Sequence, residues 1–255
     1  MSAKVVLAMR TITEIQDTLL DAVWPQGGNP NAPWDGRHFT LKGFQRPVSV
    51  SSGEAFILAG CVAMSQPSLI LEIGTGFGYS SAWLALGFVH ADLEGRIISI
   101  DNYSEGGLGP AGLNAAKSIA KSLKVEQLVD FVVGESPKDV AEYIADEIVD
   151  IAFIDADHHA DNPIHDYYAI REHLAASSLL LFHDVDHSRY TVHKAVELAQ
   201  RDGWTSHTLN TSCHLTLLFK EPSWLSIAEI ALRCAQRGVV ASDPSQLNVS
   251  DDDRS

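Results

Sequence analysis

The ten residues LEIGTGFGYS, at positions 71–80, decide the fold. A short apolar run leads directly into Gly74, Gly76 and Gly78, and an apolar segment with helical spacing begins at residue 79. Glycines in such a turn let the backbone approach a ligand closely, and the first N–H groups of the following helix point toward it. The stretch therefore predicts a buried strand, a tight loop and a helix, with a ligand bound at the loop.

The alternation of strand and helix continues along the chain. Apolar strands that alternate with helices are typical of a parallel sheet covered by helices on both faces. The predicted strands lie at 68–73, 96–101, 129–134, 149–155 and 178–183, and the predicted helices at about 79–90, 111–124, 136–146, 162–175 and 189–202.

The pattern changes after Gly203, where the segments WTSHTL and HLTLLF are separated only by residues 210–213. A link this short permits an antiparallel hairpin but no parallel crossover. We therefore predict an α/β protein with a doubly wound, seven-stranded, mostly parallel sheet that closes with a terminal antiparallel hairpin.

Three segments make up the predicted domain organisation. Residues 1–50 contain a predicted helix at 11–24 and then a Pro- and Gly-rich stretch whose aromatic residues suggest a lid. Residues 51–238 form the main domain, opened by a capping box in which Glu54 lies three residues after Ser51. The acidic residues 239–255 are expected to be a disordered tail.

Composition limits the classes of partner. The chain has 18 basic and 33 acidic residues in 255, a formal charge of -15, so phosphate backbones and anionic lipid surfaces are repelled. It has no secretory signal pattern and no apolar run near the roughly 20 residues that span a bilayer. Its three cysteines are widely spaced, which fits a reducing compartment. We expect a cytoplasmic protein that binds neither nucleic acid nor membranes, with a homodimer left open.

The loop differs from a dinucleotide fingerprint. The spacing G-x-G-x-x-G needs a third glycine where this chain has Tyr79, and Glu72 lies two residues before the first glycine. A carboxylate at that place disfavours phosphate and favours an ammonium group. A nicotinamide-dependent oxidoreductase is therefore the weaker alternative, and a non-catalytic cofactor-binding protein is another.

The pattern E-x-G-x-G-x-G after the first sheet strand resembles motif I of the class I S-adenosylmethionine-dependent methyltransferases. The resemblance covers roughly residues 50–220 and includes the closing hairpin. It implies that S-adenosylmethionine is the cofactor and that Asp101, at the end of the second strand, accepts hydrogen bonds from the ribose hydroxyls. The full set of implied cofactor-binding residues is Glu72, Gly74, Gly76, Gly78, Ser80, Asp101, Gly134, Glu135, Ser136 and Asp155.

Acidic and imidazole side chains follow two predicted neighbouring strands. The fourth strand ends in FIDADHH and the fifth in FHDVDH. Ligands of open α/β sheets lie outside the carboxyl ends of the strands, and carboxylates with imidazoles there suit a divalent cation or a base.

These strand ends resemble, more narrowly, the metal-dependent small-molecule O-methyltransferases of the catechol and caffeoyl-coenzyme A type and their antibiotic-tailoring relatives in secondary metabolism. The resemblance implies that Asp155, His183 and Asp184 bind a divalent cation, Mg²⁺ or Mn²⁺. It also implies that His158, three residues after Asp155, takes the proton of the acceptor hydroxyl. The family's adjacent pair is usually acidic or Asp-Asn, so His183 also leaves iron, or no metal, open.

The implied reaction explains the residue types. A neutral hydroxyl attacks a sulfonium methyl group poorly, whereas a cation lowers the pKa of the hydroxyl and an imidazole accepts its proton. Asp157 is an alternative ligand, and His159 or His183 an alternative base. The sequence does not separate a phenol from a sugar or a polyketide as acceptor.

Overall fold

The computed structural model describes residues 50, 52–103, 109–186, 188–209, 211, 214–222 and 224. The predicted helix at 11–24, the predicted lid apart from Val50, and the acidic tail lie outside these residues. The elements, in chain order, are α2 Ser52–Ser65, β1 Leu69–Ile73, α3 Tyr79–Ala91, β2 Arg96–Asp101, α4 Gly109–Ser122, β3 Val129–Val133, α5 Val140–Ile144, β4 Val149–Ile154, α6 Asn162–Ile170, β5 Leu174–Phe182, α7 Val192–Arg201, β6 Thr205–Thr208 and β7 Thr216–Phe219.

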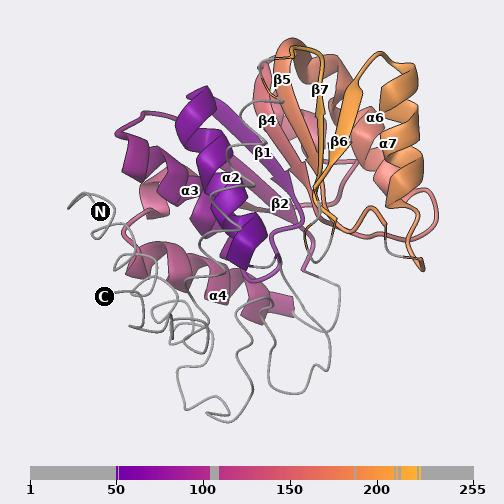
Figure 1. Ribbon diagram of the computed structural model, residues 1–255. Helices are drawn as coiled ribbons and strands as arrows, with labels where there is room; N and C mark the ends of the chain where they lie inside the picture. The colour runs from indigo at the N-terminus through magenta and orange to yellow at the C-terminus, as the bar shows by residue number, and fades with distance from the viewer. Residues whose placement is uncertain are drawn as a thin grey trace, which may run out of the picture.

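The strands of this described part form one seven-stranded sheet in the order β3-β2-β1-β4-β5-β7-β6 (Figure 1). The first five strands pair in parallel, and β7 runs antiparallel to both β5 and β6. The predicted doubly wound sheet with a terminal antiparallel hairpin is confirmed. The strand order reverses between β1 and β4, so the segments that follow these two strands lie side by side, where such sheets bind ligands.

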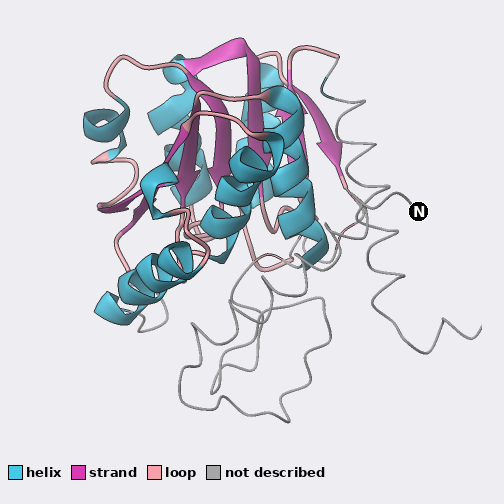
Figure 2. Cartoon of the chain, turned by 90° about the vertical axis from the view of Figure 1, so that its left-hand side faces the viewer, coloured by secondary structure: helices cyan, strands magenta, loops and turns pink. Residues whose placement is uncertain are grey.

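Both faces of the sheet are buried because its strands are apolar at successive positions. In β1, Ile70 packs with α2, α3 and α4 on one face, while Leu71 packs with α5, α6 and α7 on the other. Figure 2 shows the strands between helices on either side. Because side chains alternate along a strand, Glu72 lies on the same face as Ile70, below α3.

Three elements differ clearly from their predicted ranges, and one of them, α6, ends at Ile170 rather than at residue 175. Strand β5 begins at Leu174 rather than at residue 178, and α5 spans only Val140–Ile144. Residues 135–139 form a turn instead of helix, in which the Asp139 N–H donates to the Glu135 carbonyl at 2.8 Å. No helix in the described part of the chain is both long enough and apolar enough to cross a membrane.

Candidate active site

The glycine loop packs on the backbone that follows β4. Gly74 has φ +100°, and a Cβ there would lie 2.1 Å from the carbonyl oxygen of Asp155. Gly78 has φ +80°, and its Cβ would lie 2.6 Å from the Cβ of Ala116. Gly76, at φ +53°, has no atom within 4 Å of that position. Packing thus requires glycine at the first and third positions, and the second faces open space.

Glu72 lies beneath the loop and is fully buried. Its carboxylate accepts hydrogen bonds from Ser80 at 2.6 Å, from Ser99 at 2.5 Å and from Ser81. Burial raises the pKa of Glu72 to about 7, although the three hydroxyl donors oppose this shift. The carboxylate therefore ties β1, β2 and α3 together. Its predicted contact with an ammonium group, and that of Ser80 with the cofactor, stay predictions.

Asp101 lies at the end of β2, opposite the glycine loop. Its carboxylate accepts hydrogen bonds from the backbone N–H groups of Gly76, at 2.8 Å, and of Tyr103. Its carbonyl oxygen accepts the N–H of Gly134 at 3.1 Å. The ends of β1, β2 and β3 are therefore linked directly, and the cofactor contact predicted for Asp101 stays a prediction.

The segment after β3 continues this edge. Glu135 is exposed, and its N–H donates to Asp139 Oδ2 at 2.9 Å. The hydroxyl of Ser136 donates to Asp166 Oδ1 at 2.5 Å. Asp166 is buried on α6, and burial raises its pKa to about 6. The cofactor contacts predicted for Gly134, Glu135 and Ser136 stay predictions.

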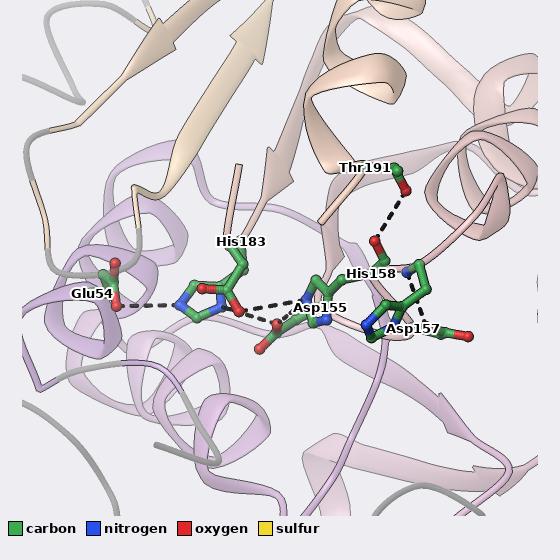
Figure 3. Close-up of polar contacts among 8 residues, drawn as sticks. Glu54, Asp155, Asp157, His158, His183 and Thr191 are labelled. Carbon is green, nitrogen blue, oxygen red and sulfur yellow. Dashed lines mark hydrogen bonds and ion pairs between the residues drawn. The ribbon is translucent and has the colours of Figure 1, made fainter. Parts of the chain in front are cut away.

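Four side chains after β4 and β5 converge next to the glycine loop (Figure 3). One ligand atom from each lies within 4.8 Å of the other three, and among the described residues this is the group that could hold a metal ion: Asp155, His158, His183 and Asp184. Asp155 follows β4 directly and His183 follows β5 directly, so parallel pairing brings them together. The three predicted ligands and the predicted base thus form one cluster.

Asp155 Oδ1 lies at the centre of the cluster. It is 3.0 Å from His183 Nδ1 and 3.2 Å from His158 Nε2. Asp184 Oδ2 is 3.6 Å from His183 Nδ1 and 3.7 Å from His158 Nε2. Asp184 has a left-handed backbone, φ +57°, which is uncommon outside glycine and concentrates at functional sites.

The imidazoles and carboxylates shift one another's pKa. Burial by itself would raise the pKa of Asp155, but His183 and His158 outweigh it and hold that pKa well below its usual range. Burial by itself would lower the pKa of His158, but Asp155 and Asp184 outweigh it and raise that pKa. His158 is only 15% exposed and His183 only 4%, so solvent screens these interactions weakly.

The two alternatives from the sequence pair with each other outside the cluster. His159 Nδ1 lies 2.9 Å from Asp157 Oδ1, and the other Asp157 oxygen accepts a hydrogen bond from Asn162 at 2.5 Å. The side chain of His159 is 58% exposed. The geometry favours Asp155 as ligand and His158 as base over these two residues.

Two further residues, which we did not predict as site residues, contact the two histidines of the cluster. Glu54 Oε2 lies 3.3 Å from His183 Nε2, and the ring of Tyr190 stacks on His158 with centroids 4.7 Å apart. Glu54 was predicted only as the reciprocal partner of Ser51 in a capping box, and Ser51 lies outside the described residues. The only feature of the sequence that could have pointed to Tyr190 as a site residue is its position shortly after the end of β5.

The donor set fits a divalent cation. Bonds of roughly 2.0–2.2 Å place neighbouring ligand atoms about 3.0–3.5 Å apart. The observed separations of 3.0–3.7 Å are close to this range. The three predicted ligands, one imidazole and two carboxylates, suit Mn²⁺, Fe²⁺ or Zn²⁺ better than Mg²⁺, which prefers oxygen ligands.

Comparison with known proteins agrees with this geometry. Residues 71–185 match the model of a methyltransferase domain. Among the curated proteins, none matches the sequence significantly.

Several solved structures share the fold at low sequence identity. Cofactor-bound Rv0187 from MTB is 18% identical with a TM-score of 0.61, and the alignment covers 82% of this chain and 90% of that one. The O-methyltransferase TomG from Streptomyces achromogenes, in complex with SAM, is 20% identical with a TM-score of 0.58, covering 81% and 89%. The O-methyltransferase from Bacillus cereus, in complex with SAH, is 20% identical with a TM-score of 0.56, covering 82% and 89%.

The matched residues contain the glycine loop, Asp101 and the whole of the acid and imidazole cluster. The sheet order and the terminal hairpin agree with the fold of these structures. This match favours a methyltransferase over the nicotinamide-dependent oxidoreductase. Residues 71–185 are similar to a methyltransferase domain, and the described part of the chain has the fold of these solved structures.

Proposed function

We propose that this enzyme transfers the methyl group of S-adenosylmethionine to a hydroxyl group of a small molecule, assisted by a divalent cation and by a histidine base. One observation carries the proposal: the cluster of Asp155, His158, His183 and Asp184 starts at the residue whose backbone packs on Gly74 of the glycine loop. The similarity in fold to solved O-methyltransferases, one of them bound to SAM, supports it.

The donor side of the proposed site is the edge formed by the ends of β1, β2 and β3. The loop of Gly74, Gly76 and Gly78 receives the methionine part of the cofactor, and Asp101 accepts the ribose hydroxyls. The segment from Gly134 to Ser136 borders the adenine. Glu72 and Ser80 support this side from beneath the loop, because they hydrogen-bond each other at 2.6 Å below it.

The acceptor side is the cluster. As the acceptor oxygen forms its bond to the methyl carbon, the bond from that carbon to sulfur breaks and S-adenosylhomocysteine leaves. His158 Nε2 takes the hydroxyl proton in the same step. A divalent cation held by Asp155, His183 and Asp184 would lower the pKa of the acceptor hydroxyl. Two neighbouring strands hold these groups, so their positions are fixed before the substrate arrives.

Formation of S-adenosylhomocysteine from S-adenosylmethionine, measured with a panel of phenols, sugars and polyketide alcohols, tests the reaction. EDTA should abolish turnover and leave calorimetric binding of S-adenosylmethionine unchanged. His158→Ala should lower the rate by roughly 10²- to 10⁴-fold with unchanged cofactor affinity, the usual contribution of one general base.

The matched control is His165→Ala, because His165 is an exposed histidine on α6. It should keep the wild-type rate. Full activity in EDTA would contradict the proposed role of the cation. A wild-type rate in His158→Ala would contradict the proposed role of His158 as the base. Binding of S-adenosylmethionine without turnover on any acceptor would favour the non-catalytic alternative.

A further inference from the structure

Glu54 contacts the cluster from helix α2, whereas the four residues of the cluster follow strands β4 and β5. It lies in the first turn of α2, is fully buried, and its Oε2 is 3.3 Å from Nε2 of His183. The two residues are 129 positions apart in the sequence. Figure 3 shows Glu54 and Asp155 on opposite sides of the His183 ring.

Both ring nitrogens of His183 face carboxylates. Nε2 faces Glu54, while Nδ1 lies 3.0 Å from Asp155 Oδ1 and 3.6 Å from Asp184 Oδ2. A neutral imidazole has one N–H and one lone pair, so only one side can receive a hydrogen bond from it. The side that does not must be stabilised by a positive charge, because two lone pairs at such distances repel each other.

The two sides of the ring differ in what can supply that charge. Asp155 and Asp184 belong to the four-residue group whose ligand atoms lie within 4.8 Å of one another, which a divalent cation fits. Glu54 is outside that group, so its side of the ring is the one left to receive the N–H. The tautomer of His183 that fits both sides therefore carries its hydrogen on Nε2, facing Glu54. Its Nδ1 lone pair then faces the cation.

We propose that Glu54 is a positioning residue: it accepts the Nε2–H of His183 and so holds the tautomer whose Nδ1 can bind the cation. Histidines that bind metals usually donate their other N–H to a carboxylate or carbonyl, which fixes the ring and makes the ligand more basic. Both side chains are almost free of solvent, with exposed fractions of 0% and 4%, so water competes little for this hydrogen bond. The tautomer follows from the cation, so this inference rests on the metal site of the proposed function but not on the methyl transfer itself.

The first test measures cation affinity without any substrate. Binding of Mn²⁺ to the metal-free protein, followed by the EPR signal of free Mn²⁺, should weaken by roughly 10- to 100-fold in Glu54→Gln, the usual effect of losing such a partner. Glu54→Asp keeps the charge and should recover part of the affinity. Glu142→Gln, the same change at an exposed position of α5, should bind as the wild type does.

The second test observes the tautomer directly. ¹⁵N NMR of the histidine-labelled protein loaded with Zn²⁺, which is diamagnetic, should show His183 with hydrogen on Nε2 and with Nδ1 bound to the ion. Absence of that signal in His183→Gln assigns it. In Glu54→Gln the Nε2–H signal should shift, because a neutral amide accepts a weaker hydrogen bond than a carboxylate does.

The outcomes separate the two proposals. A Zn²⁺-loaded wild-type protein with hydrogen on Nδ1, or Glu54→Gln with unchanged Mn²⁺ affinity, would overturn the role of Glu54. A wild-type protein that binds no Mn²⁺ would overturn both proposals. A wild-type protein that binds Mn²⁺ with the expected tautomer but keeps full turnover in EDTA would contradict only the role of the cation in the proposed function. If Glu54→Gln does not fold, the comparison of Glu54→Asp with the wild type decides in the same way.

Discussion

At the scale of single residues, Glu72 shows how a buried charge is accommodated. Its carboxylate has no exposed surface, and three serine hydroxyls donate to it. Hydrogen bonds to the ionised form lower a carboxyl pKa, whereas burial raises it. Burial is the larger effect here, and the pKa of Glu72 is about 7.

This pKa predicts a contribution of Glu72 to the pH dependence of stability. The ordinary pKa is 4.5 and the folded-state pKa is about 7, so between these values the unfolded chain loses the proton first. The free energy of unfolding should therefore fall as pH rises from about 4.5 to about 7. Glu72→Gln, which cannot ionise, should lose less stability over that interval in urea titrations.

The exposed substitution Glu142→Gln serves as the control for the loss of one carboxylate. It should leave the pH dependence of the wild type unchanged. Equal slopes for the wild type and Glu72→Gln would mean that Glu72 is ionised at all these pH values in the folded protein.

Single residues also show where sequence reasoning stops. Asp155 and His183 could be predicted to meet because both directly follow strands expected to be neighbours in a parallel sheet. Glu54 could not be predicted in the cluster. Its carboxylate meets His183 through the way α2 packs on the sheet, and no spacing in the sequence records that packing.

At the scale of elements, the start of α7 anchors the loop that carries His158. Thr191 precedes α7, and its hydroxyl donates to the carbonyl oxygens of His158 at 3.0 Å and of Ala160 at 2.6 Å. Its backbone N–H also donates to the His158 carbonyl at 2.9 Å. A helix on one side of the cluster thus fixes a loop that comes from another strand (Figure 3).

Removing this hydroxyl should loosen the loop. Thr191→Val should destabilise the fold by about 0.5–1.5 kcal/mol, the net value of a typical hydrogen bond. The rate should fall about 3- to 10-fold, since 1.4 kcal/mol corresponds to a factor of ten. Binding of S-adenosylmethionine should stay unchanged, which calorimetry can check.

The matched control is Thr208→Val, because the Thr208 hydroxyl pairs with that of Thr216 at 2.9 Å in the terminal hairpin. It should cost similar stability and leave the rate unaltered. Thr191→Ser, which keeps the hydroxyl, should restore the rate. Equal rates in Thr191→Val and the wild type would show that the anchor does not position His158.

Elements differ in how well their sequences predict them. The apolar run of β1 places the strand within one residue, because the strand is buried on both faces. The start of β5 was missed because its first residues, Leu174–Ser177, are followed by Ser178, whose hydroxyl donates to the Val149 carbonyl at 2.7 Å. That bond lies where the pairing of β4 and β5 shifts register. It gives the buried Ser178 hydroxyl a partner, whereas the sequence pattern alone predicts only apolar residues in a buried strand.

At the scale of the whole molecule, one sheet separates two hydrophobic cores. Leu180 packs in the core formed with α5, α6 and α7, and Leu181 packs in the core formed with α2, α3 and α4. Both side chains are fully buried. Each core is therefore built on strands that the other core also needs.

This shared sheet predicts a single unfolding transition. Leu180→Ala and Leu181→Ala should each lower the free energy of unfolding by about 2–5 kcal/mol. The chain has five tryptophans, of which Trp83 lies in one core and Trp204 in the other. Variants whose sole tryptophan is one of these two allow each core to be followed by fluorescence. Both reporters should give the same midpoint in urea, and separated midpoints would show that the two faces unfold independently.

The contact between Gly74 and the carbonyl oxygen of Asp155 has a consequence for redesign of the enzyme. A Cβ at Gly74 would lie 2.1 Å from that oxygen, so any other residue at position 74 would push the loop and the end of β4 apart. A library of variants made to change the ligands of this site would therefore lose most members that replace Gly74. Variation is best confined to other loops, with residues 72–78 and 155 held constant, so that the loop and the strand end keep their contact.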